Sequence, residues 1–311
     1  MGDYLLKRIL LFIPTLLGIT LITFFLIHKL PGDPVANMAG ERATPETIAR
    51  IRTEIGIDRS MATQYFLYLK RLSQGELGRS IFTNRKISDD LLQKFPNTLR
   101  LALAAMLFAS IFGIGLGTLA AVKRGTKWDR LIAFVTVGGI SVPVFWLGLA
   151  LMLIFSLYLR VLPPSGMGNG QLEYLILPAI TLGTFSLSYI ARVTRSSMLE
   201  SLSQPYIAAA RAKGLSETKV VLKHALKNSL IPIVTLIGLD LGSYLNGAVL
   251  TETIFGWDGL GRYALDGILK RDYPVIMGVV LFGAFVFVTM NLLVDLSYHL
   301  LDPRVRIKSG D

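Results

Sequence analysis

Residues 206–232 read YIAAARAKGLSETKVVLKHALKNSLIP, a strongly basic stretch that lies between two long apolar stretches of the chain. Pro205 suits the first turn of a helix, and Gly214 suits a left-handed residue just past the end of one. Ser216 can cap a second helix, and Pro232 marks the start of the next apolar stretch. The sequence therefore predicts two short helices that meet at Gly214, outside the apolar part of the protein.

The composition on both sides of this segment is that of a membrane protein. Hydrophobic residues make up 52% of the 311 residues, and the mean hydropathy is +0.55. A transmembrane helix needs about 20 largely apolar residues. Six stretches approach or exceed that length: 9–27, 99–122, 131–159, 174–191, 230–250 and 275–301. We therefore expect an all-α polytopic membrane protein with six transmembrane helices.

The first apolar stretch follows Lys7 and Arg8, as the core of a signal peptide does. Its length of about 19 residues exceeds the usual core of about 7 to 15, and no small-x-small cleavage pattern precedes Pro31. We interpret 9–27 as a retained transmembrane helix.

The positive charge follows membrane topology. Lys and Arg number 32 against 21 Asp and Glu, a formal net charge of +11. Basic residues cluster in 7–8, 123–130, 192–227 and 304–308, and they are sparse in the short loops of the opposite side. Such clusters stay in the cytoplasm. We expect a multi-pass membrane protein, with both termini cytoplasmic, that contacts lipid and no nucleic acid.

This topology places residues 30–95 outside the cytoplasm, where the sequence has helical features. Thr44 can cap a helix that stops at Gly56, and Ser60 can cap another with an apolar side over 61–72. These apolar sides favour packing on the membrane helices. A platform for a partner protein is the alternative, and both can hold together.

Glycine and proline predict how two spans are built. The third span contains GGISVP at 138–143, and we expect a bend or break there. The second span contains Gly113, Gly115 and Gly117, which we interpret as helix-packing glycines, since no strand precedes them as in a nucleotide loop.

Residues that carry chemistry are scarce. The chain has no cysteine and only three histidines, His28, His224 and His299, so it cannot assemble a His-rich or Cys-rich metal site. Neither a phosphate loop nor a nucleophile elbow occurs. We therefore expect no catalytic, cofactor-binding or metal-binding residue: the chain is not an enzyme, and any ATP is hydrolysed by another chain.

Polar residues in the fifth span are candidates for a substrate pathway. Asp240, Ser243 and Asn246 recur at intervals of three, which places them on one side of a helix. A carboxylate at membrane depth costs about 3 kcal/mol and normally faces water or the bundle interior. Either a polar path or helix–helix hydrogen bonding explains them. Asp295, near the inner end of the last span, is interpreted as structural.

The 206–232 segment resembles the signature loop of ABC importer permeases, in which Glu-Ala-Ala is followed after three residues by Gly. Ala209 and Ala210 precede Gly214 at that spacing, while Ala208 stands in place of the glutamate. The peptide branch of the family instead reads Ala-Arg-Ala-Lys-Gly and then His-Ala-Leu, which occur here at 210–214 and 224–226.

The likeness to the first (B-type) permease subunit of dipeptide and oligopeptide ABC importers extends over nearly the whole chain. The matching motifs are LPGDPV at 30–35, MAGER at 38–42, AAVKRG at 120–125, TRSSM at 194–198, TETIF at 251–255, GLGR at 259–262, RDYP at 271–274 and DPR at 302–304.

This resemblance implies the type I ABC importer permease fold, a location in the bacterial plasma (inner) membrane and the following organisation. Residues 1–29 would hold the N-terminus and first helix, 30–95 an extracytoplasmic helical segment, 96–300 the ABC transmembrane type-1 domain, and 301–311 a cytoplasmic tail. It also implies four further subunits: a homologous second permease, two cytoplasmic ATPases and an extracytoplasmic substrate-binding protein.

Within 96–300 the resemblance implies a coupling loop at 192–229 that contacts the ATPases. The residues that it assigns to ATPase coupling are Tyr206, Ala209, Ala210, Arg211, Ala212, Lys213 and Gly214. An amphipathic helix on lipid headgroups is the alternative for this loop. The cargo implied is a dipeptide or oligopeptide moved by alternating access. Glutathione and nickel importers have very similar permeases, and an ion-coupled carrier or channel with Asp240 as coupling group is an alternative of another class.

Overall fold

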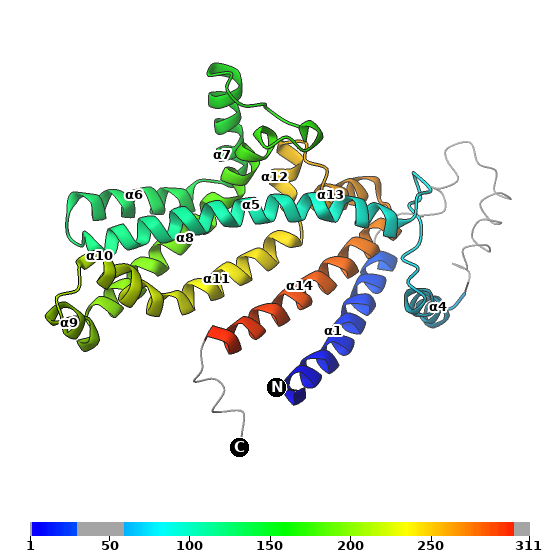
Figure 1. The fold of residues 1–311 in the computed structure, drawn as a ribbon. Helices are drawn as coiled ribbons and strands as arrows, with labels where there is room; N and C mark the ends of the chain where they lie inside the picture. Colours follow the sequence, from blue (N-terminus) through cyan, green and yellow to red (C-terminus); the bar gives the residue numbers. More distant parts are fainter. Residues whose placement is uncertain (1, 30–58, 302–311) are drawn as a thin grey trace.

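A computed structural model describes the backbone of residues 2–29 and 59–301 and the side chains of 12–25 and 59–293; this part of the chain is helical and contains no β-strand. Long helices run lengthwise through the molecule (Figure 1). They are α1 (Gly2–Lys29), α5 (Ile87–Val122), α8 (Glu173–Leu202), α11 (Lys227–Leu245) and α14 (Tyr273–Leu301).

The length and composition of these helices confirm a helical, polytopic membrane protein. Four helices are long and apolar enough to cross a membrane: Ile87–Val122, Glu173–Leu202, Glu217–Leu245 and Tyr273–Leu293. The bent pair Lys127–Ser141 and Val144–Tyr158 makes a fifth if it is one span, and the described apolar part of α1 is the shorter Phe12–Phe25. The count of six spans stays a prediction.

The predicted break in the third span is confirmed. Two residues separate α6 (Lys127–Ser141) from α7 (Val144–Leu151). The helical segments Lys127–Ser141 and Val144–Tyr158 differ in direction by 106°. Pro143 has no N–H and holds Val142 in an extended conformation, with φ −77° and ψ 125°. α7 packs on α8 and α12 and continues into the π-helical η1 (Met152–Tyr158), which projects away from the other helices (Figure 1).

Small residues let α5 and α8 approach closely. A Cβ on Gly113 would lie 2.8 Å from Ile190 Cγ2, and one on Gly117 would collide with the Ala191 carbonyl oxygen. The prediction of packing glycines is confirmed at these two positions and wrong at Gly115, which has nothing within 4 Å. Gly113 and Gly117 are four residues apart and share a helix face, whereas Gly115 lies on the other side.

Because of this difference, we expect Gly117→Leu to lower the free energy of unfolding by about 2 kcal/mol or more, since the new side chain must push α8 away. Gly115→Leu is the matched control on the same helix, where better helix propensity and open space leave stability equal or slightly higher. The measurement is the thermal unfolding midpoint of the two purified variants in detergent. Equal midpoints would contradict the close α5–α8 packing.

The fifth span differs from the sequence-based expectation at both ends. Its helix is continuous from α10 (Glu217–Lys219) through the π-helical η3 (Val220–Leu226) into α11, so Pro232 lies inside a helix and does not start one. A proline removes one helical hydrogen bond, which membrane helices tolerate.

At the other end, α11 stops at Leu245, short of residue 250. Gly247 has φ +100°, and a Cβ there would lie 2.7 Å from the amide nitrogen of Gly261. The left-handed conformation ends the helix and brings two backbones into contact. Two short helices follow before α14, namely α12 (Val249–Ile254) and α13 (Leu260–Lys270).

The described part of the segment between the first two spans packs on α1. Ser60 caps α4 (Met61–Ser73) as predicted, and its hydroxyl accepts a hydrogen bond from the Thr63 amide at 3.3 Å. The Tyr65 hydroxyl lies 3.0 Å from Thr20 Oγ1, and its ring lies 5.3 Å from that of Phe24. These contacts agree with packing on the membrane helices. The helix predicted from Thr44 lies outside the described residues.

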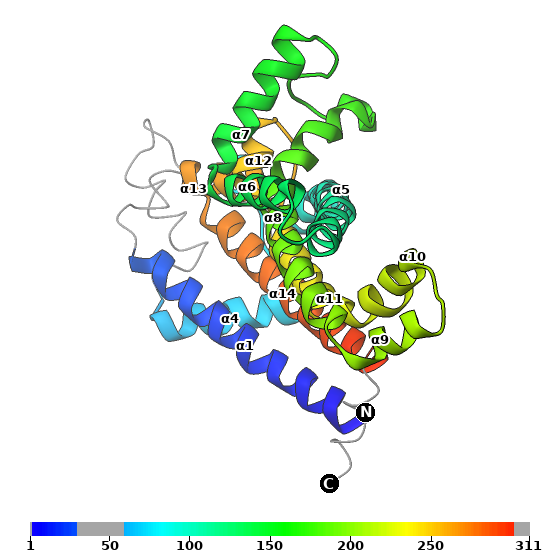
Figure 2. The ribbon, with the colours of Figure 1, turned by 90° about the vertical axis from the view of Figure 1, so that its left-hand side faces the viewer.

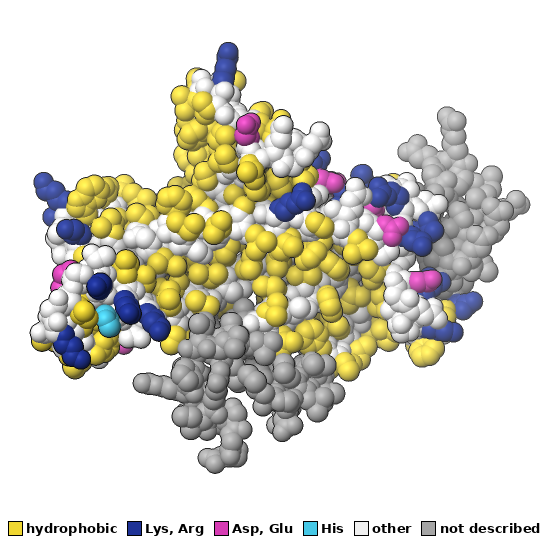
Figure 3. All heavy atoms as spheres, viewed as in Figure 1, with side chains coloured by type: hydrophobic (Ala, Val, Ile, Leu, Met, Phe, Trp, Pro, Cys, Tyr) yellow, Lys and Arg dark blue, Asp and Glu magenta, His cyan; other side chains and the backbone are white. Residues whose placement is uncertain are grey.

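The two ends of the bundle carry different short helices. α9 (Pro205–Ala212) and α10 lie at one end, and α12 and α13 lie towards the other (Figures 1 and 2). On the face in Figure 3, apolar side chains cover the middle, and most Lys and Arg side chains gather near the ends. This distribution fits a membrane protein whose apolar middle lies in lipid and whose two ends are exposed to water.

Candidate functional site

The predicted pair of helices in the coupling loop is present. α9 and α10 lie beside each other at one end of the molecule (Figure 2), joined by residues 213–216. Gly214 has φ +74°, the left-handed conformation that its position after a helix predicts. A Cβ on Gly214 would meet nothing within 4 Å, so this glycine faces open space in the isolated chain.

A small apolar core ties this pair of helices to the spans. Ile207 and Ala210 of α9 are buried against Met198 of α8 and against Val220 and Ala225 of η3. Ala121, at the end of α5, belongs to the same cluster. Because protein interiors are closely packed, we expect a displacement of α9 to shift the ends of α5, α8 and the helix that continues into α11.

Polar contacts strengthen the connection. The Tyr206 hydroxyl lies 2.6 Å from Ser201 Oγ, which donates a hydrogen bond to the Ala225 carbonyl at 3.1 Å. Arg211 donates two hydrogen bonds to Glu217, at 2.7 and 3.2 Å, and thereby bridges the turn at Gly214. The hydrogen bond with Glu217 raises the pKa of the exposed Arg211 guanidinium.

Six of the seven residues predicted for ATPase coupling are exposed. They are Tyr206, Ala209, Arg211, Ala212, Lys213 and Gly214. Ala210 is 6% exposed and packs inward, so it supports the loop and does not offer a contact surface.

The three residues predicted for the substrate pathway have different neighbours. Asp240 accepts a hydrogen bond from Ser186 of α8 at 2.5 Å, and the Tyr244 hydroxyl lies 2.6 Å from the same Ser186 oxygen. Ser243 is exposed. Asn246 donates to the Gly242 carbonyl at 3.1 Å and lies against α14 near Gly283.

Asp240 therefore links α11 to α8, the alternative that the sequence left open, while a polar path through all three residues stays a prediction. The side chain of Asp295 lies beyond those that the structure describes.

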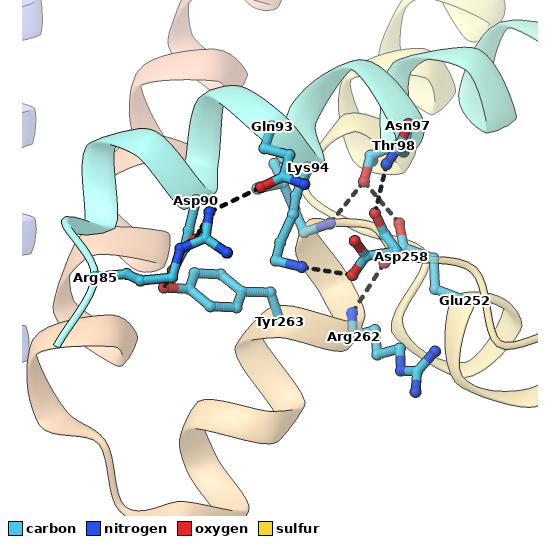
Figure 4. A network of polar contacts seen from close by, with 11 residues as sticks. Arg85, Asp90, Gln93, Lys94, Asn97, Thr98, Glu252, Asp258, Arg262 and Tyr263 are labelled. Carbon is cyan, nitrogen blue, oxygen red and sulfur yellow. Dashed lines mark hydrogen bonds and ion pairs between the residues drawn. The ribbon is translucent and has the colours of Figure 1, made fainter. Parts of the chain in front are cut away.

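A second polar site, which the sequence analysis missed, joins α5 to α12 and α13 (Figure 4). Glu252 of α12 is fully buried. It accepts hydrogen bonds from Thr98 Oγ1 of α5 at 2.8 Å and from the amide nitrogen of Arg262 at 2.9 Å. Thr98 Oγ1 also accepts from the Leu260 amide at 2.8 Å. The carboxylate and the hydroxyl together satisfy the free amides at the start of α13.

Burial raises the pKa of the Glu252 carboxyl, and the hydrogen bonds from Arg262 and Thr98 oppose that shift. Glycines make room for the group. A Cβ on Gly261 would lie 3.0 Å from Glu252 Oε2, and a Cβ on Gly259 would collide with the same carboxylate. The TETIF and GLGR motifs therefore contact each other, through the Glu252 carboxylate of the first and the backbone of the second.

The contacts of Glu252 and Thr98 with the start of α13 are called the α5–α13 network, and further contacts extend this network along α5. Lys94 forms an ion pair with Asp258 at 2.5 Å, and the Trp257 indole donates to the Asn97 carbonyl at 2.9 Å. Nearer the start of α5, Asp90 accepts from Tyr263 at 3.0 Å and pairs with Arg85 at 3.0 Å. Within the described residues, no group of three or more His, Asp or Glu is placed to hold a metal ion.

Two family models match this chain, one over its C-terminal part and one over its N-terminal part. The family described as "Binding-protein-dependent transport system inner membrane component" matches residues 113–307. The family described as "Binding-prot-dependent transport system membrane comp, N-term" matches residues 1–102.

Two relatives match over nearly their whole length. The "Dipeptide transport system permease protein DppB" of Escherichia coli (strain K12) is 43% identical over 338 residues, which cover 99% of this chain and 100% of the relative. The "Glutathione transport system permease protein GsiC" of Salmonella paratyphi A (strain ATCC 9150 / SARB42) is 43% identical over 308 residues, with the same coverage.

Among solved structures, an inward-facing conformation of the MetNI methionine ABC transporter matches with a TM-score of 0.54. The match covers 68% of this chain and 96% of that chain at 17% identity, so the likeness concerns the fold.

Proposed function

Since this chain belongs to the family of binding-protein-dependent transport system inner membrane components, we propose that it is the permease subunit of an ATP-driven importer of dipeptides or oligopeptides. The observation that carries the proposal is the exposed surface of the coupling loop, whose underside is packed against the inner ends of α5, α8 and η3. The cargo follows from the 43% identity to a dipeptide permease over the full length.

The proposed mechanism is alternating access between an outward-facing and an inward-facing cavity. Two cytoplasmic ATPases bind the coupling loop, and their closure moves α9 as a rigid body together with α8 and α11. This chain performs no covalent chemistry. A homologous second permease completes the pathway, and a separate binding protein selects the peptide outside.

The sidedness that this mechanism needs follows from the charges. The basic loops at 123–130 and 192–227 lie in the cytoplasm, as do both termini, and residues 30–95 lie outside. We propose that residues 96–300 form the ABC transmembrane domain and that 301–311 form a cytoplasmic tail. α5 begins at Ile87, before the start of this domain.

Glutathione is the second candidate cargo, because a glutathione permease is as similar as the dipeptide permease, at 43% identity. Nickel remains a third cargo to test. An ion-coupled carrier is disfavoured, because Asp240, its coupling group, is hydrogen-bonded to Ser186 between two helices.

Uptake of labelled dipeptide, glutathione and nickel by cells with and without this chain tests the proposal. We expect deletion to abolish the uptake of dipeptide that depends on its partner subunits, and plasmid-borne chain to restore it. A loss confined to glutathione or nickel would correct the cargo. Unchanged uptake of all three would reject the proposed importer.

A further inference from the structure

A cavity of about 360 Å³ opens between α6 and α8 beside the end of α5, on the basic side of the molecule. Three arginines contribute to its lining: Arg130 of α6 and Arg192 and Arg195 of α8. Arg192 and Arg195 stand at the start of the predicted loop 192–229, but none of the seven residues predicted for ATPase coupling lines the cavity, and neither does any of the three predicted for the substrate pathway.

Only one of the three guanidinium groups is neutralised by a carboxylate. Arg195 donates to Asp129 at 2.7 and 2.9 Å, and the same carboxylate accepts from the Gly125 amide at 2.9 Å. Arg130 and Arg192 have no ion pair among the residues whose side chains are described. The mouth of the cavity therefore carries an excess of positive charge that two exposed arginines can offer to an anion.

Apart from the buried Thr136, the walls of the cavity away from Asp129 and the arginines are apolar. Ile132, Ala133 and Val137 of α6 line it, and Arg130 and Val137 lie about 10 Å apart along the helix axis. Phe134 on the same helix is 78% exposed, as a side chain that faces lipid is. Trp128, at the start of α6, is 59% exposed and marks the level of the lipid headgroups. The charged mouth is thus at headgroup depth, and the apolar wall extends into the acyl region.

We propose that this cavity binds an anionic phospholipid of the cytoplasmic leaflet, with Arg130 and Arg192 on the phosphate and an acyl chain along Ala133 and Val137. Guanidinium groups bind phosphate through paired hydrogen bonds, and basic pockets between membrane helices suit such headgroups. The apolar wall favours a lipid over free phosphate. This proposal goes beyond peptide import and requires only that this end of the bundle lies at the inner membrane surface.

Native mass spectrometry of the full chain in its purified complex tests the proposal, with phosphatidylglycerol titrated in neutral detergent. We expect the double variant Arg130→Gln with Arg192→Gln to weaken phosphatidylglycerol binding at least about ten-fold, a loss of roughly 1.4 kcal/mol. Lys123→Gln with Lys127→Gln removes the same charge from the neighbouring turn, outside the cavity lining, and is expected to change binding less than about two-fold.

A second variant tests the apolar wall without changing any charge. Ala133 is exposed and lines the cavity, so Ala133→Trp fills the acyl site and is expected to weaken binding as well. The site is overturned if both cavity variants bind phosphatidylglycerol like the parent protein. The lipid assignment is wrong if excess inorganic phosphate displaces phosphatidylglycerol completely, or if phosphatidylcholine binds equally well. Transport is not part of the readout, so a wrong cargo would leave the result intact.

Discussion

Gly214→Asn is expected to lower ATP-dependent peptide uptake at least about ten-fold while the variant inserts normally and its complex still hydrolyses ATP. Asparagine accepts a left-handed conformation better than other side chains, so the φ of +74° costs little. The new side chain projects from the exposed surface of the coupling loop, where the ATPase must approach the backbone. The measurement is uptake into proteoliposomes together with ATP turnover.

Gly125→Asn is the matched control. Gly125 has φ +78°, and a Cβ there, like one on Gly214, would meet nothing within 4 Å. It lies in the turn between α5 and α6, outside the coupling loop. Uptake by Gly125→Asn should stay within about two-fold of the parent, since the backbone cost is the same. If Gly214→Asn transports as well as this control, the coupling surface is misassigned.

Glu252→Ala is expected to give the largest loss of stability in this chain, about 3–5 kcal/mol. The substitution leaves the Thr98 hydroxyl and the amide of Arg262 without their acceptor in a fully buried site, and it also opens a cavity. The thermal unfolding midpoint in detergent should fall by roughly 5–10 °C.

Two further substitutions serve as comparisons for Glu252→Ala. Glu173→Ala removes an exposed carboxylate in the first turn of α8 and should leave the midpoint nearly unchanged. Glu252→Gln keeps one oxygen but presents an NH₂ group to amide donors, so an intermediate loss is expected. A midpoint of Glu252→Ala equal to that of Glu173→Ala would show that the α5–α13 network does not hold the helices together.

Local sequence signals were sufficient for much of the fold. Apolar length identified the long helices, the proline at 143 identified the break after α6, and Gly214 identified the turn between α9 and α10. Each of these features depends on residues close in sequence. The two packing glycines, Gly113 and Gly117, were also accessible from their spacing, which should have separated them from Gly115.

The α5–α13 network was beyond local reasoning because its partners are far apart in the sequence. Thr98 and Glu252 are separated by 154 positions. A glutamate just past an apolar stretch is ordinarily exposed, and no neighbouring residue in the sequence indicates that Glu252 is buried. The TETIF and GLGR motifs could be recognised in the sequence, but only the folded structure shows that they contact each other. Likewise, the side of Asp240 that faces α8 depends on how two helices pack.

α5 is a single rod that is anchored at both ends of the molecule. Its 36 residues correspond to a length of about 54 Å. Ala121 at one end belongs to the core under α9, and Thr98 near the other is hydrogen-bonded to Glu252. A stiff rod acts as a lever: a tilt of about 10° around one end displaces the other by roughly 9 Å. A tilt of α5 that accompanies a movement of α9 would therefore also displace the contact with α12 and α13.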